Sequence, residues 1–108
     1  MYPLNDNIYT NSPDIEPTRT GFGRGLKAAG QADKRIVGLC ADLVESVKMD
    51  AFAREFPERY IEVGIAEQNL VTVAAGLARV GKIPFAASYA AFSPGRNWEQ
   101  IKTTACLN

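Results

Sequence analysis

The stretch from residue 59 to residue 78 constrains the fold of this chain more than any other part of it. A short extended run, 60–63, turns at Gly64 and enters a helix expected over about 66–79. Apolar side chains occur nearly all the way round that helix, which is typical of a helix buried inside a protein. Its first turn nevertheless carries Glu67 among apolar neighbours. A carboxylate at the start of a buried helix requires a specific explanation.

Chemistry alone offers two interpretations of Glu67. The first is an acid that interacts with the helix dipole, worth about 0.3–1 kcal/mol. The second starts from the cost of ionising a carboxyl among apolar side chains, which favours a partly protonated group. Such a group can exchange a proton with a nitrogen of a bound heterocycle. The residue types by themselves leave these two alternatives evenly balanced.

Short apolar runs alternate with helical segments along the chain. Strands are expected over 35–40, 60–63 and 83–88, and each is followed by a loop and a helix. This alternation predicts an α/β fold, a three-layer sandwich with a partial parallel sheet of about three strands. We expect helices over about 17–29 with a stop at Gly30, over 51–56 after an N-cap at Asp50, over 66–79, and over 98–106 after an N-cap at Asn97.

A three-stranded parallel sheet leaves one edge and one helix face uncovered. A chain of 108 residues also has a marginal core, since it buries only ~60–65% of its unfolded surface. We therefore expect residues 16–108 to be a truncated domain, or one whose missing half comes from a partner. Residues 1–15 are polar and turn-rich, which predicts a flexible N-terminal arm.

Composition narrows the classes of function. Twelve basic residues balance twelve acidic ones, so no net charge favours nucleic acid or an anionic membrane. The chain has no His, and its two Cys are far apart, so we expect no metal site in it. It shows no secretory signal and no run of apolar residues long enough to cross a bilayer, so we expect a cytoplasmic protein. Cys40 is interpreted as a small buried residue.

Glycines at 21, 23 and 25 superficially resemble a dinucleotide-binding loop. That motif requires a strand leading into the glycine turn, and no strand is expected before residue 17. We therefore interpret these glycines either as places where another part of the backbone can approach the helix closely or as marks of irregular structure.

Polar and aromatic residues follow each expected strand. Asp42 and Ser46 follow the first strand, Glu67 the second, and Tyr89 and Phe92 the third. Singly, such residues are more often turn formers or core aromatics, and cations such as Arg19 and Lys48 are usually solvated. The carboxyl ends of parallel strands meet at one edge, where open α/β sheets bind ligands. The combination therefore favours a ligand site at that edge.

Four segments together resemble the pyrimidine-binding domain of the transketolase family of thiamine diphosphate enzymes. They occur in the family's order and span most of the chain from residue 16 onward: PTRTGFG at 17–23, CADLVES at 40–46, YIEVGIAEQN at 60–69 with AAGLA at 74–78, and PFAASYAAF at 84–92. The chain is most similar to the split type, in which this domain begins a separate C-terminal subunit. The residues 93–96, SPGR, differ from full-length transketolases.

The resemblance implies roles for individual residues. Glu67 matches the glutamate that hydrogen-bonds the aminopyrimidine ring nitrogen and so activates the cofactor. Phe92 matches the aromatic residue that stacks on the pyrimidine, with Tyr89 beside it, and Asp42 matches an acid near the cofactor. Arg19 and Ser46 match positions that contact the sugar-phosphate substrate.

The resemblance also implies what must come from elsewhere. The diphosphate and its Mg²⁺ or similar cation bind in this family to another domain, whose acidic motif this sequence lacks. We therefore expect a homo- or hetero-oligomer with a diphosphate-binding transketolase subunit, and an isolated chain that is inactive. The implied reaction is two-carbon ketol transfer between sugar phosphates of the pentose phosphate pathway. Two alternatives stay open: a 1-deoxy-D-xylulose-5-phosphate synthase-like subunit, and a non-catalytic fragment or interaction module.

Overall fold

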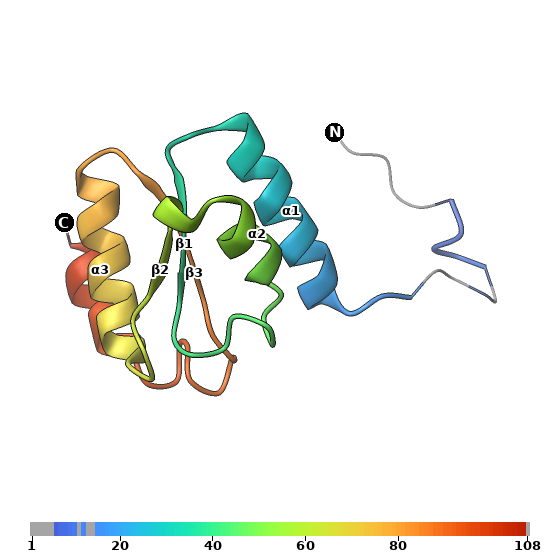
Figure 1. Cartoon of the computed structure of the whole chain (residues 1–108). Coiled ribbons are helices and arrows are strands. Elements are labelled where there is room, and N and C mark those ends of the chain that lie inside the picture. Colours follow the sequence, from blue (N-terminus) through green and yellow to red (C-terminus); the bar gives the residue numbers. More distant parts are fainter. Residues whose placement is uncertain (1–5, 11, 13–14, 108) are drawn as a thin grey trace.

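The computed structural model describes residues 6–10, 12 and 15–107. Helices lie on both faces of a small sheet, α1 and α2 on one face and α3 on the other (Figure 1). In chain order the elements are α1 (Thr18–Ala32), β1 (Ile36–Cys40), α2 (Asp50–Glu55), the 3₁₀ helix η1 (Pro57–Arg59), β2 (Tyr60–Glu62), α3 (Glu67–Arg79), β3 (Ile83–Ala87), α4 (Trp98–Gln100) and the π-helix η2 (Ile101–Cys106).

The sheet has three parallel strands in the order β2-β1-β3. Gly38 of β1 lies opposite Tyr60 on one side and opposite Phe85 on the other. All five residues of β1 are buried, as expected of a continuous apolar run at the centre of a parallel sheet. The predicted three-layer α/β fold with about three parallel strands is confirmed.

Side chains of β1 alternate between two separate cores. Ile36 and Cys40 belong to the core under α1 and α2, where Phe52 is fully buried. Val37 and Leu39 belong to the core under α3. This alternation follows from the two-residue period of a strand, so one strand joins both helix layers.

Helix α1 differs from its prediction at the C-terminal end. It continues to Ala32, and Gly30 lies inside it instead of ending it. A Cβ atom on Gly30 would lie 2.6 Å from the ring of Phe52, so glycine is needed there for close packing and not for a turn. Gly23 plays a similar part, because a Cβ there would overlap the carbonyl oxygen of Lys48. The predicted close backbone approach is thus confirmed at this position.

Two predicted helix caps are also corrected. Asp50 is the first residue of α2 instead of its N-cap, and its carboxylate pairs with Arg54 one turn later, at 2.6 Å. Asn97 does occupy the N-cap position of α4, but its side chain makes no capping hydrogen bond. The single helix expected over 98–106 is divided into α4 and the π-helix η2.

The prediction that α3 is buried all round is wrong for the described structure. Only Glu67 and Leu70 of this helix are buried, and Gly76, Ala78 and Arg79 are exposed. One side of α3 covers the sheet, and η2 packs against another part of the helix. The apolar residues of α3 therefore exceed what the three described strands can cover.

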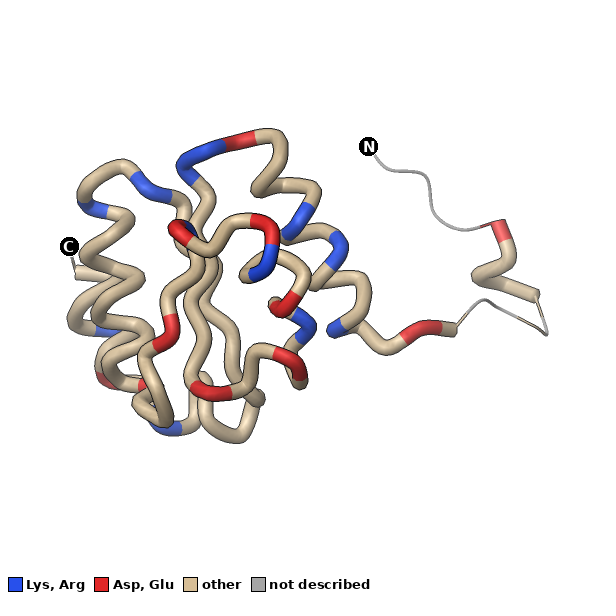
Figure 2. The backbone as a smooth tube through the Cα atoms, viewed as in Figure 1, with Lys and Arg blue, Asp and Glu red and all other residues tan. Residues whose placement is uncertain are grey.

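The distribution of charged residues agrees with the equal numbers of basic and acidic residues in the sequence. Both Lys and Arg residues and Asp and Glu residues occur at each end of the sheet (Figure 2). No helix in the described part of the chain is long and apolar enough to span a membrane. Of the predicted arm over 1–15, positions 1–5, 11 and 13–14 lie outside the described residues, and Thr10 closes an exposed turn on Asn7.

Two glycine substitutions in α1 test the close approach of its backbone. Gly23→Ala should destabilise the protein by about 1–3 kcal/mol, because the new methyl group overlaps the backbone at Lys48. Gly25→Ala should stabilise it by about 0.5–1 kcal/mol, because no described atom lies within 4 Å and alanine favours the helix. Urea unfolding of both variants measures these changes, and equal effects would contradict the packing described.

Candidate functional site

The loops that follow the three strands meet at one edge of the sheet (Figure 1). Asp42 follows β1, Glu67 follows β2 and begins α3, and Tyr89 and Phe92 follow β3. Because all three strands are parallel, this edge is the carboxyl edge expected to bind a ligand. The predicted clustering of these loops therefore agrees with the topology.

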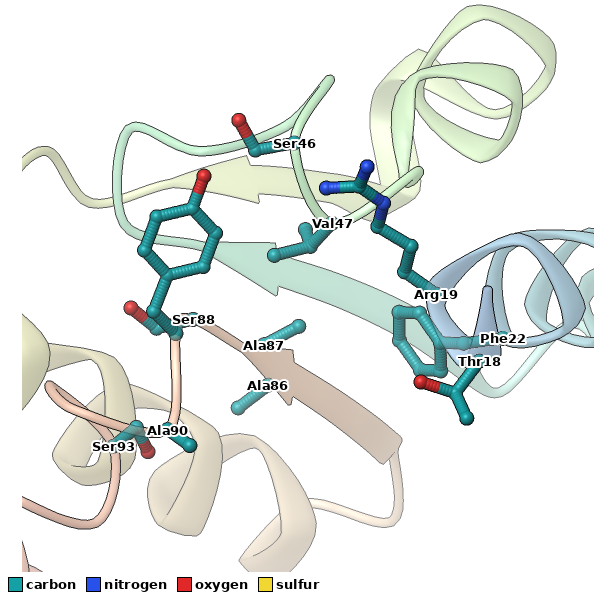
Figure 3. Close-up of a pocket in the computed structure, with 11 residues that line it drawn as sticks. Thr18, Arg19, Phe22, Ser46, Val47, Ala86, Ala87, Ser88, Ala90 and Ser93 are labelled. Carbon is teal, nitrogen blue, oxygen red and sulfur yellow. The ribbon is translucent and has the colours of Figure 1, made fainter. Parts of the chain in front are cut away.

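A cavity of about 500 Å³ at this edge brings together three predicted site residues. Arg19, Ser46 and Tyr89 line it, together with Ser88. Figure 3 shows the guanidinium of Arg19 directed toward the loop that carries Ser46 and Val47. Val47, Ala86 and Ala87 also line it, so the cavity combines a cation and hydroxyl groups with apolar side chains.

Glu67 lies at a second cavity of about 620 Å³, beside Ile65 and Arg96. Only 4% of its side chain is exposed, and its Oε2 lies 3.4 Å from Nη1 of Arg96. The fully buried Asn97 donates a hydrogen bond from Nδ2 to the Glu67 carbonyl oxygen at 3.0 Å. The loop after β3 is thereby held against the start of α3.

Phe92 contacts residues of both cavities, Tyr89 of the first and Arg96 of the second. Its ring centroid lies 5.9 Å from that of Tyr89, with the two planes tilted by 33°. On Arg96, the Cζ atom lies 4.1 Å from the Phe92 centroid, within the range of a cation–π contact. The predicted aromatic pair therefore exists, and Arg96 contacts both Phe92 and Glu67.

Asp42 differs from the other predicted residues in its position. Among the described residues that line the two cavities, Asp42 does not occur. Its backbone has a φ of 56°, and its amide donates a 2.7 Å hydrogen bond to Oε1 of Glu62. The structure therefore places Asp42 at the same edge but not with Glu67 or with Arg19.

Glu62 holds two loop segments together through hydrogen bonds, a role that the sequence pattern did not reveal. Its carboxylate accepts hydrogen bonds from the amides of Asp42 and Gly64 and from the hydroxyl of Tyr60, all within 2.9 Å. Partial burial acts to raise the pKa of Glu62, but these hydrogen bonds outweigh it and lower the pKa. One carboxylate thus links the loop after β1 to the turn before α3. One of the three donors is the amide of Asp42, whose backbone is left-handed, and no sequence feature indicated this contact.

Cys40 lies next to this cluster, and its environment disfavours reaction of its thiol. It is fully buried and not disulfide-bonded. Burial raises the pKa of the Cys40 thiol, so a nucleophilic thiolate is disfavoured. The interpretation of Cys40 as a small buried residue is confirmed. Elsewhere in the described residues, no three Cys, Asp or Glu side chains gather closely enough to hold a metal ion.

Comparison with known proteins identifies the family of this site. Residues 16–108 match the family described as transketolase, pyrimidine binding domain. The chain belongs to that transketolase family. A solved structure described as a split gene transketolase, inactive beta4 tetramer, superposes with a TM-score of 0.72 and 52% identity, over 81% of this chain and 29% of that one.

Relatives by sequence include both transketolases and synthases. A putative transketolase C-terminal section from Methanocaldococcus jannaschii is 48% identical over 78% of this chain. A 6-deoxy-6-sulfo-D-fructose transketolase subunit from Clostridium sp. is 48% identical over 66% of it, and a 1-deoxy-D-xylulose-5-phosphate synthase from Halothermothrix orenii is 42% identical over 80% of it. The chain spans 27%, 22% and 13% of these relatives, respectively.

The residues at the carboxyl edge fit the heterocyclic part of a cofactor of this transketolase domain. Glu67 presents a buried carboxylate with a single long contact, and Phe92 and Tyr89 present aromatic rings. Ser88 adds a buried hydroxyl that makes no hydrogen bond within the described part of the chain. A carboxylate beside aromatic rings suits a heterocycle better than a diphosphate.

Removing the charge of Glu62 tests its ordering role. Glu62→Gln should lower the free energy of unfolding at neutral pH, because three donors lose a charged acceptor. The pKa of Glu62 is lower in the folded protein, so its stabilisation is present above the unfolded value of about 4.3 and is lost as the pH falls through the folded value.

Urea unfolding of wild type and Glu62→Gln from pH 7 to pH 3 measures this effect. The difference in stability should be largest near neutral pH and should shrink in acid. Glu45→Gln is the matched control, because it removes an exposed acid from the loop after β1. If the difference in the free energy of unfolding between wild type and Glu62→Gln stayed constant across this pH range, the charge of Glu62 would not be the source of the stabilisation.

Proposed function

We propose that this chain supplies the pyrimidine half of a thiamine diphosphate site in a transketolase assembly. When bound, thiamine diphosphate supplies the chemistry that carries a two-carbon unit from a ketose phosphate to an aldose phosphate. The side chain of Glu67 is the observation that carries the proposal. It is a 4% exposed carboxylate at the carboxyl edge of a parallel sheet, at the first residue of a helix.

Glu67 acts on the ring of the cofactor by holding or accepting a proton at a carboxylate oxygen. Burial removes water that would otherwise compete for this hydrogen bond. The amides at the start of α3 partly balance the negative charge, and the loop after β3 fixes the helix start through Asn97. A carboxylate placed in this way is suited to proton exchange with a ring nitrogen.

Phe92 and Tyr89 provide aromatic surface for the pyrimidine. Offset aromatic pairs contribute about 0.5–1.5 kcal/mol beyond the burial of their area. Ser88 lines the neighbouring cavity with Tyr89, and its buried hydroxyl makes no hydrogen bond within the described residues. Asp42 is proposed to act near the cofactor from the loop that Glu62 holds in place.

Arg19 and Ser46 form the substrate end of the proposed site. They line the same cavity, with the Arg19 guanidinium directed toward the loop that carries Ser46 (Figure 3). A guanidinium can bind a phosphate through two parallel hydrogen bonds, and a serine hydroxyl can add a third. This combination supports a sugar phosphate as the substrate.

A partner subunit is proposed to bind the diphosphate and the divalent cation that accompanies it. The apolar surface on α3 supports a partner, because the described strands leave Ala78 and Gly76 of this helix exposed. The similarity to a split gene transketolase described as a tetramer supports a homo- or hetero-oligomer. The unpaired cysteines agree with the reducing cytoplasm that we propose as its location.

A 1-deoxy-D-xylulose-5-phosphate synthase-like activity is the second candidate. The 42% identity to the Halothermothrix orenii synthase supports it, since this identity is close to that with the transketolase sections. Both candidates assign the same role to Glu67. An assembly assayed separately for two-carbon transfer from xylulose 5-phosphate and for formation of 1-deoxy-D-xylulose 5-phosphate distinguishes the two.

Substitution of Glu67 tests the proposed function directly. In the chain co-expressed with a diphosphate-binding partner subunit, Glu67→Gln should reduce turnover by about 10²- to 10⁴-fold, because it removes the proton-exchanging carboxyl but keeps its shape. Steady-state rates of two-carbon transfer from xylulose 5-phosphate provide the measurement.

The matched control for this test is Glu58→Gln. It removes an acid that is 71% exposed in η1, before the amino end of β2, and it should leave the rate unchanged. Wild-type turnover in Glu67→Gln would overturn the assignment of the activating carboxylate.

A further inference from the structure

Arg96 contacts two groups that the proposed function assigns to the pyrimidine ring. Its Nη1 lies 3.4 Å from Oε2 of Glu67, and its Cζ lies 4.1 Å from the centroid of Phe92. The residue lies in the loop after β3, four positions beyond Phe92. No role for Arg96 follows from the family motifs matched in this chain.

The Glu67 carboxylate meets Arg96 through one of its two oxygens, Oε2, beside the cavity that both residues line. Its side chain is only 4% exposed, so a ligand reaches it through the cavity that Arg96 also lines. A hydrogen bond from a ring nitrogen and a contact from the guanidinium would both approach the same carboxylate. A heterocycle whose ring nitrogen hydrogen-bonds Oε2 therefore competes with the guanidinium for Glu67.

The backbone of Arg96 is fixed, while its side chain extends toward solvent. Its amide donates a 2.8 Å hydrogen bond to the carbonyl oxygen of Phe92, and Asn97 anchors the next position to α3. The side chain of Arg96 itself is 52% exposed. The guanidinium can thus rotate away from Glu67 while the loop keeps Phe92 in place.

We propose that Arg96 is a positioning residue of the pyrimidine half-site. Its guanidinium contacts both the Glu67 carboxylate and the Phe92 ring, and it releases the Glu67 carboxylate when the heterocycle binds. This inference rests on the proposed function, because it concerns the same half-site. Its consequence is that Arg96 lowers the affinity for the cofactor.

Cofactor binding by Arg96 variants tests the inference. Wild type, Arg96→Ala and Arg96→Lys would each be co-expressed with the diphosphate-binding partner and titrated calorimetrically with thiamine diphosphate in Mg²⁺ buffer. Arg96→Ala should bind about three- to tenfold more tightly, because exposed ion pairs and cation–π contacts of this kind are weak. Arg96→Lys should fall between the two, since it keeps the charge but loses the planar stacking group.

A second pair of variants separates the Glu67 contact from a general effect of charge. In a Glu67→Gln background, Arg96→Ala should tighten binding less than it does with Glu67 present, because the charged partner is already gone. Lys102→Ala, which removes a positive charge from η2, should leave the dissociation constant unchanged.

Unchanged or weaker binding by Arg96→Ala would overturn the competition. If Arg96→Ala increased the affinity for thiamine diphosphate equally in the Glu67→Gln background, that result would overturn the competition as well. Absence of thiamine diphosphate binding by the wild-type assembly is a different result, because it would overturn the proposed function itself and this inference with it.

Discussion

The parallel pairing of β1 with both of its neighbours is the constraint on which the rest of the structure depends. β1 lies between β2 and β3 and sends alternate side chains into two cores. Because all three strands run the same way, the loops that follow them open at one edge. Glu67, Tyr89 and Arg19 reach that edge from different elements. The position of the candidate site is therefore a consequence of the sheet.

Much of this arrangement could be predicted from residue types. Apolar runs and turn residues located the three strands, and their alternation with helices predicted the layers. Other features depend on partners distant in sequence, which local patterns do not contain. The sequence pattern predicts a helix stop at Gly30, whereas in the structure this residue lies inside α1 and packs against Phe52. Glu62 accepts a hydrogen bond from the amide of Asp42, and local patterns do not contain this contact between residues distant in sequence. The roles assigned to the site residues remain predictions.

The carboxyl edge carries two chemically different regions joined by an aromatic pair. One region, with Arg19 and Ser46, offers groups that bind anions, and the other offers the buried carboxylate of Glu67. Phe92 contacts Arg96 on the Glu67 side and lies near Tyr89 on the other. Within the described residues there is no metal-binding cluster. The two regions and the aromatic pair support the proposed half-site for a cofactor.

Calorimetric titration with thiamine diphosphate tests this central claim most directly. The isolated chain, the diphosphate-binding partner and their mixture would be titrated separately in Mg²⁺ buffer. Because the chain is proposed to hold only the pyrimidine, the account predicts tight binding by the mixture and no tight binding by the isolated chain. A dissociation constant of about 1 μM for the isolated chain, equivalent to about −8 kcal/mol, would contradict a shared site.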